Sequence, residues 1–125
     1  MIGVMSGTSL DGLDLALVEF NLIKGKWTYR YVSTTTTPYP DSWQKQLENA
    51  RFLEAEALAI LNRDYTTYLA EQIQLFIAQN PSYTIDLVCS HGHTVHHKPD
   101  QGITFQIGNQ RELSSHLKTT VVCDF

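Results

Sequence analysis

The sequence is poor in cysteine, in basic residues and in long apolar runs. Its two cysteines, Cys89 and Cys123, each end an apolar stretch, which suits small buried thiols better than a disulfide framework or a paired metal site. Nine Lys and Arg residues against 13 Asp and Glu residues give a net charge of -4, which argues against nucleic acid or an anionic membrane as the main partner. No stretch approaches the roughly 20 apolar residues of a membrane helix, and the N-terminus has no signal-peptide pattern. We therefore expect a cytoplasmic protein.

The composition suits a single folded domain over residues 1–125. Hydrophobic residues make up 42% of the chain and charged residues 18%, as in ordinary soluble domains. We predict strands at 2–5 and 13–18, a turn within 21–26, a strand from 27, a helix from about 41, a helix at 54–79, a strand at 85–89, a loop at 90–102, a strand at 103–107, a helix at 110–117 and a strand at 120–123. This order indicates an α/β fold: a mixed sheet of three antiparallel strands followed by parallel strands, with helices packed on it.

Two apolar patterns support these elements. Within 54–79, apolar side chains recur at helical spacing, at Leu58, Leu61, Tyr65, Tyr68, Leu69, Ile73 and Phe76. We expect the tyrosines of this stripe to belong to the core and not to a ligand-stacking site. In the third strand, Trp27, Tyr29 and Tyr31 alternate, which places their rings on one face.

A turn of small and polar residues between the first two predicted strands is the most informative segment. Gly7 and Gly12 tolerate unusual backbone angles and close approach, so the amides and the Thr8 and Ser9 hydroxyls can come near an anion. Asp11 is then placed to bind Mg²⁺ through water beside a polyphosphate. The segment has no Walker lysine, so it is not an ordinary P-loop. The alternative is a tight hairpin whose side chains only satisfy turn geometry.

A histidine-rich segment follows the predicted strand at 85–89, where ligands of parallel sheets gather. His91 and His93 have the spacing of an H-x-H metal-ligand pair. Neutral histidines that bond to the backbone of an ordered loop are a second interpretation. We favour a third one, recognition of a hydroxylated or anionic substrate through the Gly92 backbone, the Thr94 hydroxyl and imidazole donors. Asp124 follows the last strand, where its carboxylate is a candidate base.

Four segments together resemble the anhydro-N-acetylmuramic acid kinases of the sugar kinase, Hsp70 and actin superfamily. Residues 2–14 are similar to the opening of that family, and 91–99 resemble its H-G-Q-T-[IV]-x-H-x-P segment. Gln106-Ile107-Gly108 and residues 121–125 resemble its Q-I-G and V-V-x-D-F landmarks, in the same order. The four segments span nearly the whole chain.

The resemblance implies a ribonuclease-H-like (actin-like ATPase) domain and ATP-dependent cleavage of a 1,6-anhydro amino sugar. The product would be N-acetylmuramate 6-phosphate, formed during recycling of cell-wall fragments. ATP and Mg²⁺ are the implied cofactors. The implied phosphate-binding residues are Gly7, Thr8, Ser9, Asp11 and Gly12, and the implied sugar-binding residues are His91, Gly92, His93, Thr94 and His97.

The chain departs from the family pattern in two informative ways. His93 stands where the family commonly has Gln, so one imidazole replaces an amide. The pattern also continues beyond Phe125, with a later Asp as the base. Residues 1–125 thus resemble part of the N-terminal lobe of a two-lobe kinase without its second lobe, and we expect this fragment to be inactive by itself.

Two other functions compete with that interpretation. The first is a non-catalytic nucleotide- or sugar-binding module, or one subunit of a split kinase. The second is a small metal hydrolase built on His91, His93 and His97. We expect association with a C-terminal lobe, and a homodimer is a further possibility.

Overall fold

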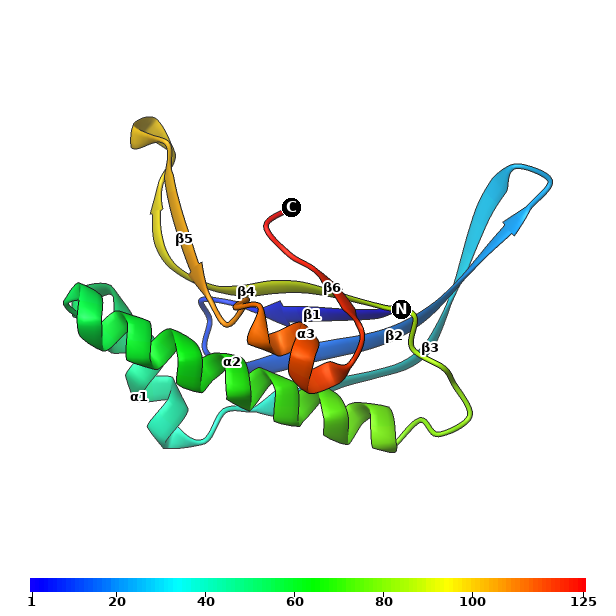
Figure 1. Cartoon of the computed structure of the whole chain (residues 1–125), viewed down its shortest axis with the longest axis horizontal. Coiled ribbons are helices and arrows are strands. Elements are labelled where there is room, and N and C mark those ends of the chain that lie inside the picture. The colour runs from blue at the N-terminus through cyan, green and yellow to red at the C-terminus, as the bar shows by residue number, and fades with distance from the viewer.

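The computed structural model describes residues 1–125 as a six-stranded mixed sheet with helices on one face (Figure 1). The strands are β1 (Ile2–Ser6), β2 (Gly12–Ile23), β3 (Lys26–Pro38), β4 (Leu87–Lys98), β5 (Ile103–Ile107) and β6 (Thr120–Val122). The α-helices are α1 (Asp41–Asn49), α2 (Ala55–Ala78) and α3 (Glu112–Leu117), with short 3-10 helices at Ala50–Phe52 and Pro99–Gln101. The predicted α/β class and mixed sheet are confirmed.

The sheet has the order β3-β2-β1-β4-β5, and β6 also pairs with β4. The first three strands are antiparallel neighbours, and β1 runs parallel to β4. The first part of β4 pairs in parallel with β6, while its second part pairs antiparallel with β5. The predicted loop at 90–102 is therefore wrong over most of its length. Its polar residues adopt a strand because β5 supplies the backbone partners that a loop would lack.

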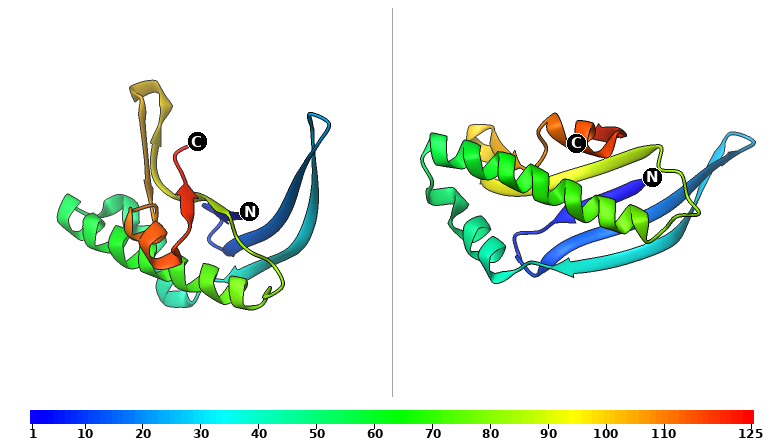
Figure 2. Two further views of the ribbon diagram at one scale, coloured as in Figure 1. Left: turned by 45° about the vertical axis from the view of Figure 1, so that its right-hand side comes forward. Right: turned by 60° about the horizontal axis from the view of Figure 1, so that its bottom comes forward.

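The hydrophobic core lies between the sheet and the helices. α1 and α2 cover one face, and α3 packs against α2 (Figure 2). The stripe predicted along 54–79 is confirmed, because all of its members except the partly buried Leu58 are buried, and Leu58 packs against the core. Tyr65 and Tyr68 are core residues, as expected. No helix combines the length and apolar character needed to cross a membrane.

The opposite face of the sheet carries no helix and is concave. The β2–β3 and β4–β5 hairpins both curl toward this side, and the C-terminal tail lies between them (Figure 1). The β2–β3 turn is tighter than predicted, because the strands continue to Ile23 and from Lys26. Trp27, Tyr29 and Tyr31 share one face as expected, with 5.8 Å between the ring centroids of the two tyrosines.

Candidate functional site

The turn between β1 and β2 is held by one backbone hydrogen bond, from the Leu10 amide to the Gly7 carbonyl at 3.3 Å. Leu10 has the left-handed φ of 59°, and neither glycine of the turn has a positive φ, so the prediction of unusual angles at the glycines is wrong. Gly12 lies close to β3, whereas the predicted approach of an anion to the turn glycines stays a prediction. A Cβ atom on Gly12 would lie 2.6 Å from the Thr37 carbonyl oxygen on β3.

Several donors of this turn are not used by the protein's own backbone. The Thr8 and Ser9 amides make no hydrogen bond within the protein. The Ser9 hydroxyl instead donates to Asp11 Oδ1 at 2.6 Å. This bond, together with the Asp11 and Gly12 amides, lowers the pKa of the exposed Asp11 carboxyl below its ordinary value. Asp11 is therefore ionised at neutral pH.

The turn and the histidine-rich strand face the same cavity of about 770 Å³. Its walls come from the end of β1, the turn, β4, β5 and the C-terminal tail. Of the residues predicted from the sequence, it is lined by Gly7, Thr8, Ser9, His91, Thr94, His97 and Asp124. Asp11, Gly12, Gly92 and His93 lie outside this lining. The structure thus brings together the two segments that the sequence singled out, although about 80 residues separate them.

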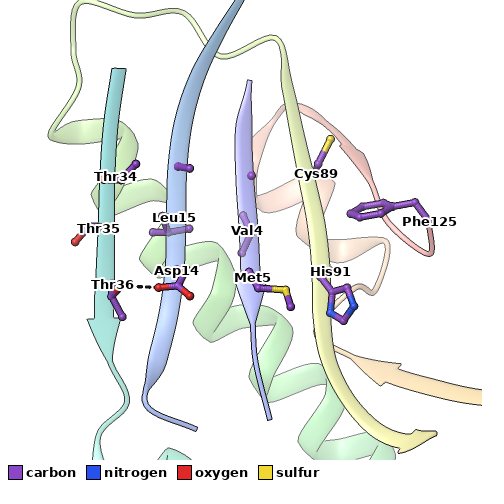
Figure 3. Close-up of a pocket in the computed structure, with 12 residues that line it drawn as sticks. Val4, Met5, Asp14, Leu15, Thr34, Thr35, Thr36, Cys89, His91 and Phe125 are labelled. Carbon is purple, nitrogen blue, oxygen red and sulfur yellow. Dashed lines mark hydrogen bonds between the residues drawn. The ribbon is translucent and has the colours of Figure 1, made fainter. Parts of the chain in front are cut away.

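A β-bulge in β4 explains why the side chains of His91 and His93 lie on different faces of the sheet. Val4 of β1 pairs with Ser90 and Ser6 pairs with His93, so two steps along β1 match three along β4. The extra residue reverses the alternation of faces: His91 lies on the open face with Cys89 (Figure 3), and His93 on the buried face with Ser90.

Gly92 makes this bulge possible. Its φ is 70°, and a Cβ atom would lie 2.6 Å from Asn109 Nδ2 and 2.7 Å from the Ile107 carbonyl oxygen. The H-x-H pairing of His91 and His93 as metal ligands is therefore wrong, because their side chains lie on different faces. No group of three or more His, Cys, Asp or Glu side chains in the protein is arranged to hold a metal ion.

On the cavity side, His91 belongs to a chain of polar contacts. Its Nδ1 donates to the Gly92 carbonyl oxygen at 3.1 Å, and its Nε2 accepts from Gln106 Nε2 at 3.2 Å. Gln106 also approaches Thr94 Oγ1 at 3.4 Å. On the same side, His97 Nδ1 and Thr104 Oγ1 are 3.1 Å apart.

Gln106 and Thr104 were not predicted as site residues. The signal was available, because β5 alternates apolar and polar residues and these two side chains share its polar face. Their partners could not be read from the sequence, since the pairing of β4 with β5 depends on a strand that was predicted as a loop.

A second cavity of about 650 Å³ adjoins the first on the open face of the sheet (Figure 3). The two share Met5, His91 and Phe125. Asp14 lines this second cavity and accepts a hydrogen bond from Thr36. It is a further carboxylate near the turn that sequence reasoning left without a role.

Beneath the turn, on the buried face, four polar side chains contact one another. Ser6 Oγ lies 2.8 Å from the Tyr39 hydroxyl, 2.7 Å from the Tyr65 hydroxyl and 3.3 Å from His93 Nδ1. The two tyrosine hydroxyls are 2.6 Å apart. Burial raises the pKa of both tyrosines and lowers the pKa of His93, so all three side chains are uncharged at neutral pH.

Comparison with known proteins adds an independent observation. A family model described as anhydro-N-acetylmuramic acid kinase matches residues 1–125. The anhydro-N-acetylmuramic acid kinase of Rhodopseudomonas palustris is 35% identical over 135 residues, which cover 99% of this chain and 36% of the relative. The kinase of Zymomonas mobilis is 36% identical (99% and 37% covered), and that of Acaryochloris marina is 35% identical (100% and 34% covered). The chain thus spans about a third of the length of these relatives.

Proposed function

Because this chain belongs to the anhydro-N-acetylmuramic acid kinase family, we propose that residues 1–125 form the phosphate-binding turn and one wall of the sugar site of such a kinase. The cavity shared by the turn and the histidine-rich strand is the observation that carries this proposal. The strand order β3-β2-β1-β4, with β6 parallel beside β4, supports a ribonuclease-H-like fold.

At the phosphate end, the chain supplies neutral donors and one carboxylate. The free amides of Thr8 and Ser9 and the Thr8 hydroxyl can donate hydrogen bonds to the oxygens of an ATP phosphate. The turn has no lysine that would bind the same oxygens. Asp11 is exposed and ionised, which fits an outer ligand that holds Mg²⁺ through water. Bound Mg²⁺ would neutralise charge that develops on the transferred phosphoryl group. Gly12 keeps the turn close to β3.

At the sugar end, the wall offers hydroxyls, an amide and imidazoles. His91, Thr94 and His97 line it, together with Gln106 and Thr104 from β5. Such groups both donate and accept hydrogen bonds, as recognition of a polyhydroxylated amino sugar requires. Gly92 contributes by shaping the bulge that turns His91 toward the cavity.

The proposed reaction opens the 1,6-anhydro ring and phosphorylates the sugar oxygen that is released. Water attacks the anomeric carbon as the bond from that carbon to O6 breaks, and O6 takes the γ-phosphoryl group of ATP while ADP leaves. Asp124 is the carboxylate of the shared cavity, so it is our candidate for orienting or activating water. It lies in an exposed tail next to the chain end. We propose that residues 1–125 alone bind phosphate but do not turn over, and that the further polypeptide of the longer relatives completes the cleft.

Nucleotide titration of the 125-residue chain tests the binding part. We expect Mg-ATP to shift the amide resonances of Thr8 and Ser9, and Asp11→Asn to weaken binding only when Mg²⁺ is present. Asp86→Asn is the matched control, because Asp86 is also exposed but precedes β4 at the opposite end of the sheet. Equal affinity of Asp11→Asn and the parent with Mg²⁺ would remove Asp11 from this role.

An activity assay tests the rest of the proposal. Incubation of the chain with ATP and the anhydro sugar should yield no phosphorylated sugar. Turnover by residues 1–125 would contradict the expected inactivity. Sugar-induced shifts at His91 and Thr94 without any response to ATP would favour a sugar-binding module instead.

A further inference from the structure

The buried polar cluster of Ser6, Tyr39, Tyr65 and His93 lies directly behind the phosphate-facing turn. Ser6 is the last residue of β1, is 2% exposed, and precedes Gly7. Its hydroxyl contacts residues from three other parts of the fold: Tyr39 after β3, Tyr65 on α2 and His93 on β4. The cluster therefore anchors the point at which the chain leaves the sheet and enters the turn.

Counting protons fixes the direction of the hydrogen bonds in this cluster. Tyr65 donates to Ser6. The contact between the two tyrosines then takes its proton from Tyr39, and the contact between Ser6 and Tyr39 takes its proton from Ser6. All three hydroxyl protons are now in use. The fourth contact, from Ser6 Oγ to His93 Nδ1, is a hydrogen bond only if His93 carries its proton on Nδ1.

We propose that His93 is a positioning residue for the turn: its Nδ1–H donates to Ser6 and holds in place the residue from which Gly7, Thr8 and Ser9 follow. The inference rests on the proposed phosphate-binding role of the turn. It moves His93 out of the expected sugar contacts and gives it an indirect role from the buried face of β4.

The surroundings of His93 keep its ring neutral and ordered. The side chain is 3% exposed, and its ring meets the Tyr65 ring edge-on with 6.2 Å between centroids. Burial, and secondarily the neighbouring His91, lower its pKa. The titratable neighbours of its ring are His91 and the uncharged tyrosines of the cluster. The charged Glu48 and Arg51 share with His93 the lining of an adjoining cavity of about 330 Å³. A neutral ring satisfies the cluster through a single Nδ1–H, with no net charge to bury.

Glutamine is the informative replacement at this position. Its side-chain amide carries donor protons, so His93→Gln keeps a donor for Ser6, whereas His93→Leu removes it.

The ring tautomer of the unmodified chain gives the first test. Long-range ¹H–¹⁵N correlation spectra distinguish an imidazole protonated at Nδ1 from one protonated at Nε2. We expect His93 to be the Nδ1–H tautomer at pH 7.5, in the absence of nucleotide. An Nε2–H tautomer would overturn the proposal, whatever the variants do.

The variants give the second test, again without nucleotide. We expect His93→Leu to shift the amide resonances of Gly7, Thr8 and Ser9, and His93→Gln to leave them near their parent positions. Ser90→Ala is the matched control. Ser90 lies on the same buried face of β4, but its hydroxyl has no partner, so its removal should leave the turn unchanged.

Each outcome of these tests decides the proposal separately from the proposed function. A folded His93→Leu protein with parent-like turn resonances would overturn the positioning role. If His93→Leu does not fold, the tautomer of the parent chain decides. Failure of ATP to bind the parent would count against the phosphate-binding proposal and not against the hydrogen bond from His93 to Ser6.

Discussion

His91 and His93 are the same residue type, two positions apart on one strand, yet their surroundings are opposite. His91 lines an open cavity and bonds to the Gly92 backbone and Gln106. His93 is 3% exposed and bonds to Ser6 inside a closed cluster. In a regular strand both would face the same side. The comparison shows that one inserted residue, Gly92, places one histidine at the cavity and the other in the buried cluster.

The two faces also differ in how much a lost contact should cost. Polar groups around the cavity can exchange their partners for water, so each contact contributes little to stability. Polar groups in the cluster have no such replacement, and a missing partner leaves a buried group unsatisfied. Loss of one hydrogen bond should therefore lower the stability more on the buried side of β4 than on the cavity side.

Substitution of Gly92, which separates the two histidines, should have the largest effect on stability. Gly92→Ala places a Cβ atom against Asn109 and Ile107 at a left-handed φ. We expect a loss of about 2–4 kcal/mol in the free energy of unfolding, measured by urea denaturation. Gly102→Ala is the control, because Gly102 has a φ of 65° but open space around it. Its loss should be about 1 kcal/mol. Equal losses for both variants would show that crowding at the bulge is unimportant.

Removal of one hydroxyl from the cluster should have the next largest effect. Tyr65→Phe deletes the donor to Ser6 and the acceptor for Tyr39, so it leaves buried partners unsatisfied. We expect a loss of about 1–3 kcal/mol in unfolding free energy. Tyr68→Phe is the matched control on the same helix, because the Tyr68 hydroxyl makes no hydrogen bond within the protein. A Tyr65→Phe protein as stable as Tyr68→Phe would contradict the importance of the cluster.

Acidification should have a smaller effect through the buried His93. The pKa of His93 is lowered in the folded state from an ordinary value of 6.5. Below that ordinary value the unfolded chain binds a proton that the folded chain does not, so stability should fall as pH decreases toward the folded-state pKa. One group contributes at most about 1.4 kcal/mol per pH unit. Unfolding free energies measured between pH 7.5 and 5 check this.

His93→Gln separates this titration from all others, because glutamine has no charged form in that range. The slope of stability against pH should become shallower in the variant by the contribution of one proton. An unchanged slope would mean that His93 titrates at the same pH in the folded and unfolded chains.

Much of the fold was predictable because local patterns report on burial. The apolar stripe of α2, the alternation in β2 and the aromatic face of β3 each follow from a repeat in the sequence. The second half of β4 was missed because its residues are polar and it forms a strand only by pairing with another segment, β5. Polar strands depend on pairing, which local propensity does not record.

Part of the candidate site was predictable for a similar reason. The small and hydroxylated residues of the turn indicate a backbone that is open to an anion. The position of the left-handed residue, Leu10 and not a glycine, was not predictable from residue types. Nor was the use of the Ser9 hydroxyl by Asp11, because it depends on the final path of the turn.

By itself the sequence determined the α/β class, the long buried helix, the turn of small residues after β1 and the family resemblance, because these depend on residue types and short spacings. Only the tertiary structure decided which side of β4 each histidine occupies. That choice depends on a bulge at Gly92, where Ile107 and Asn109, which lie 15 or more positions further along the chain, leave no room for a Cβ atom. The face on which a side chain lies is set by strand register, and register is a property of paired strands.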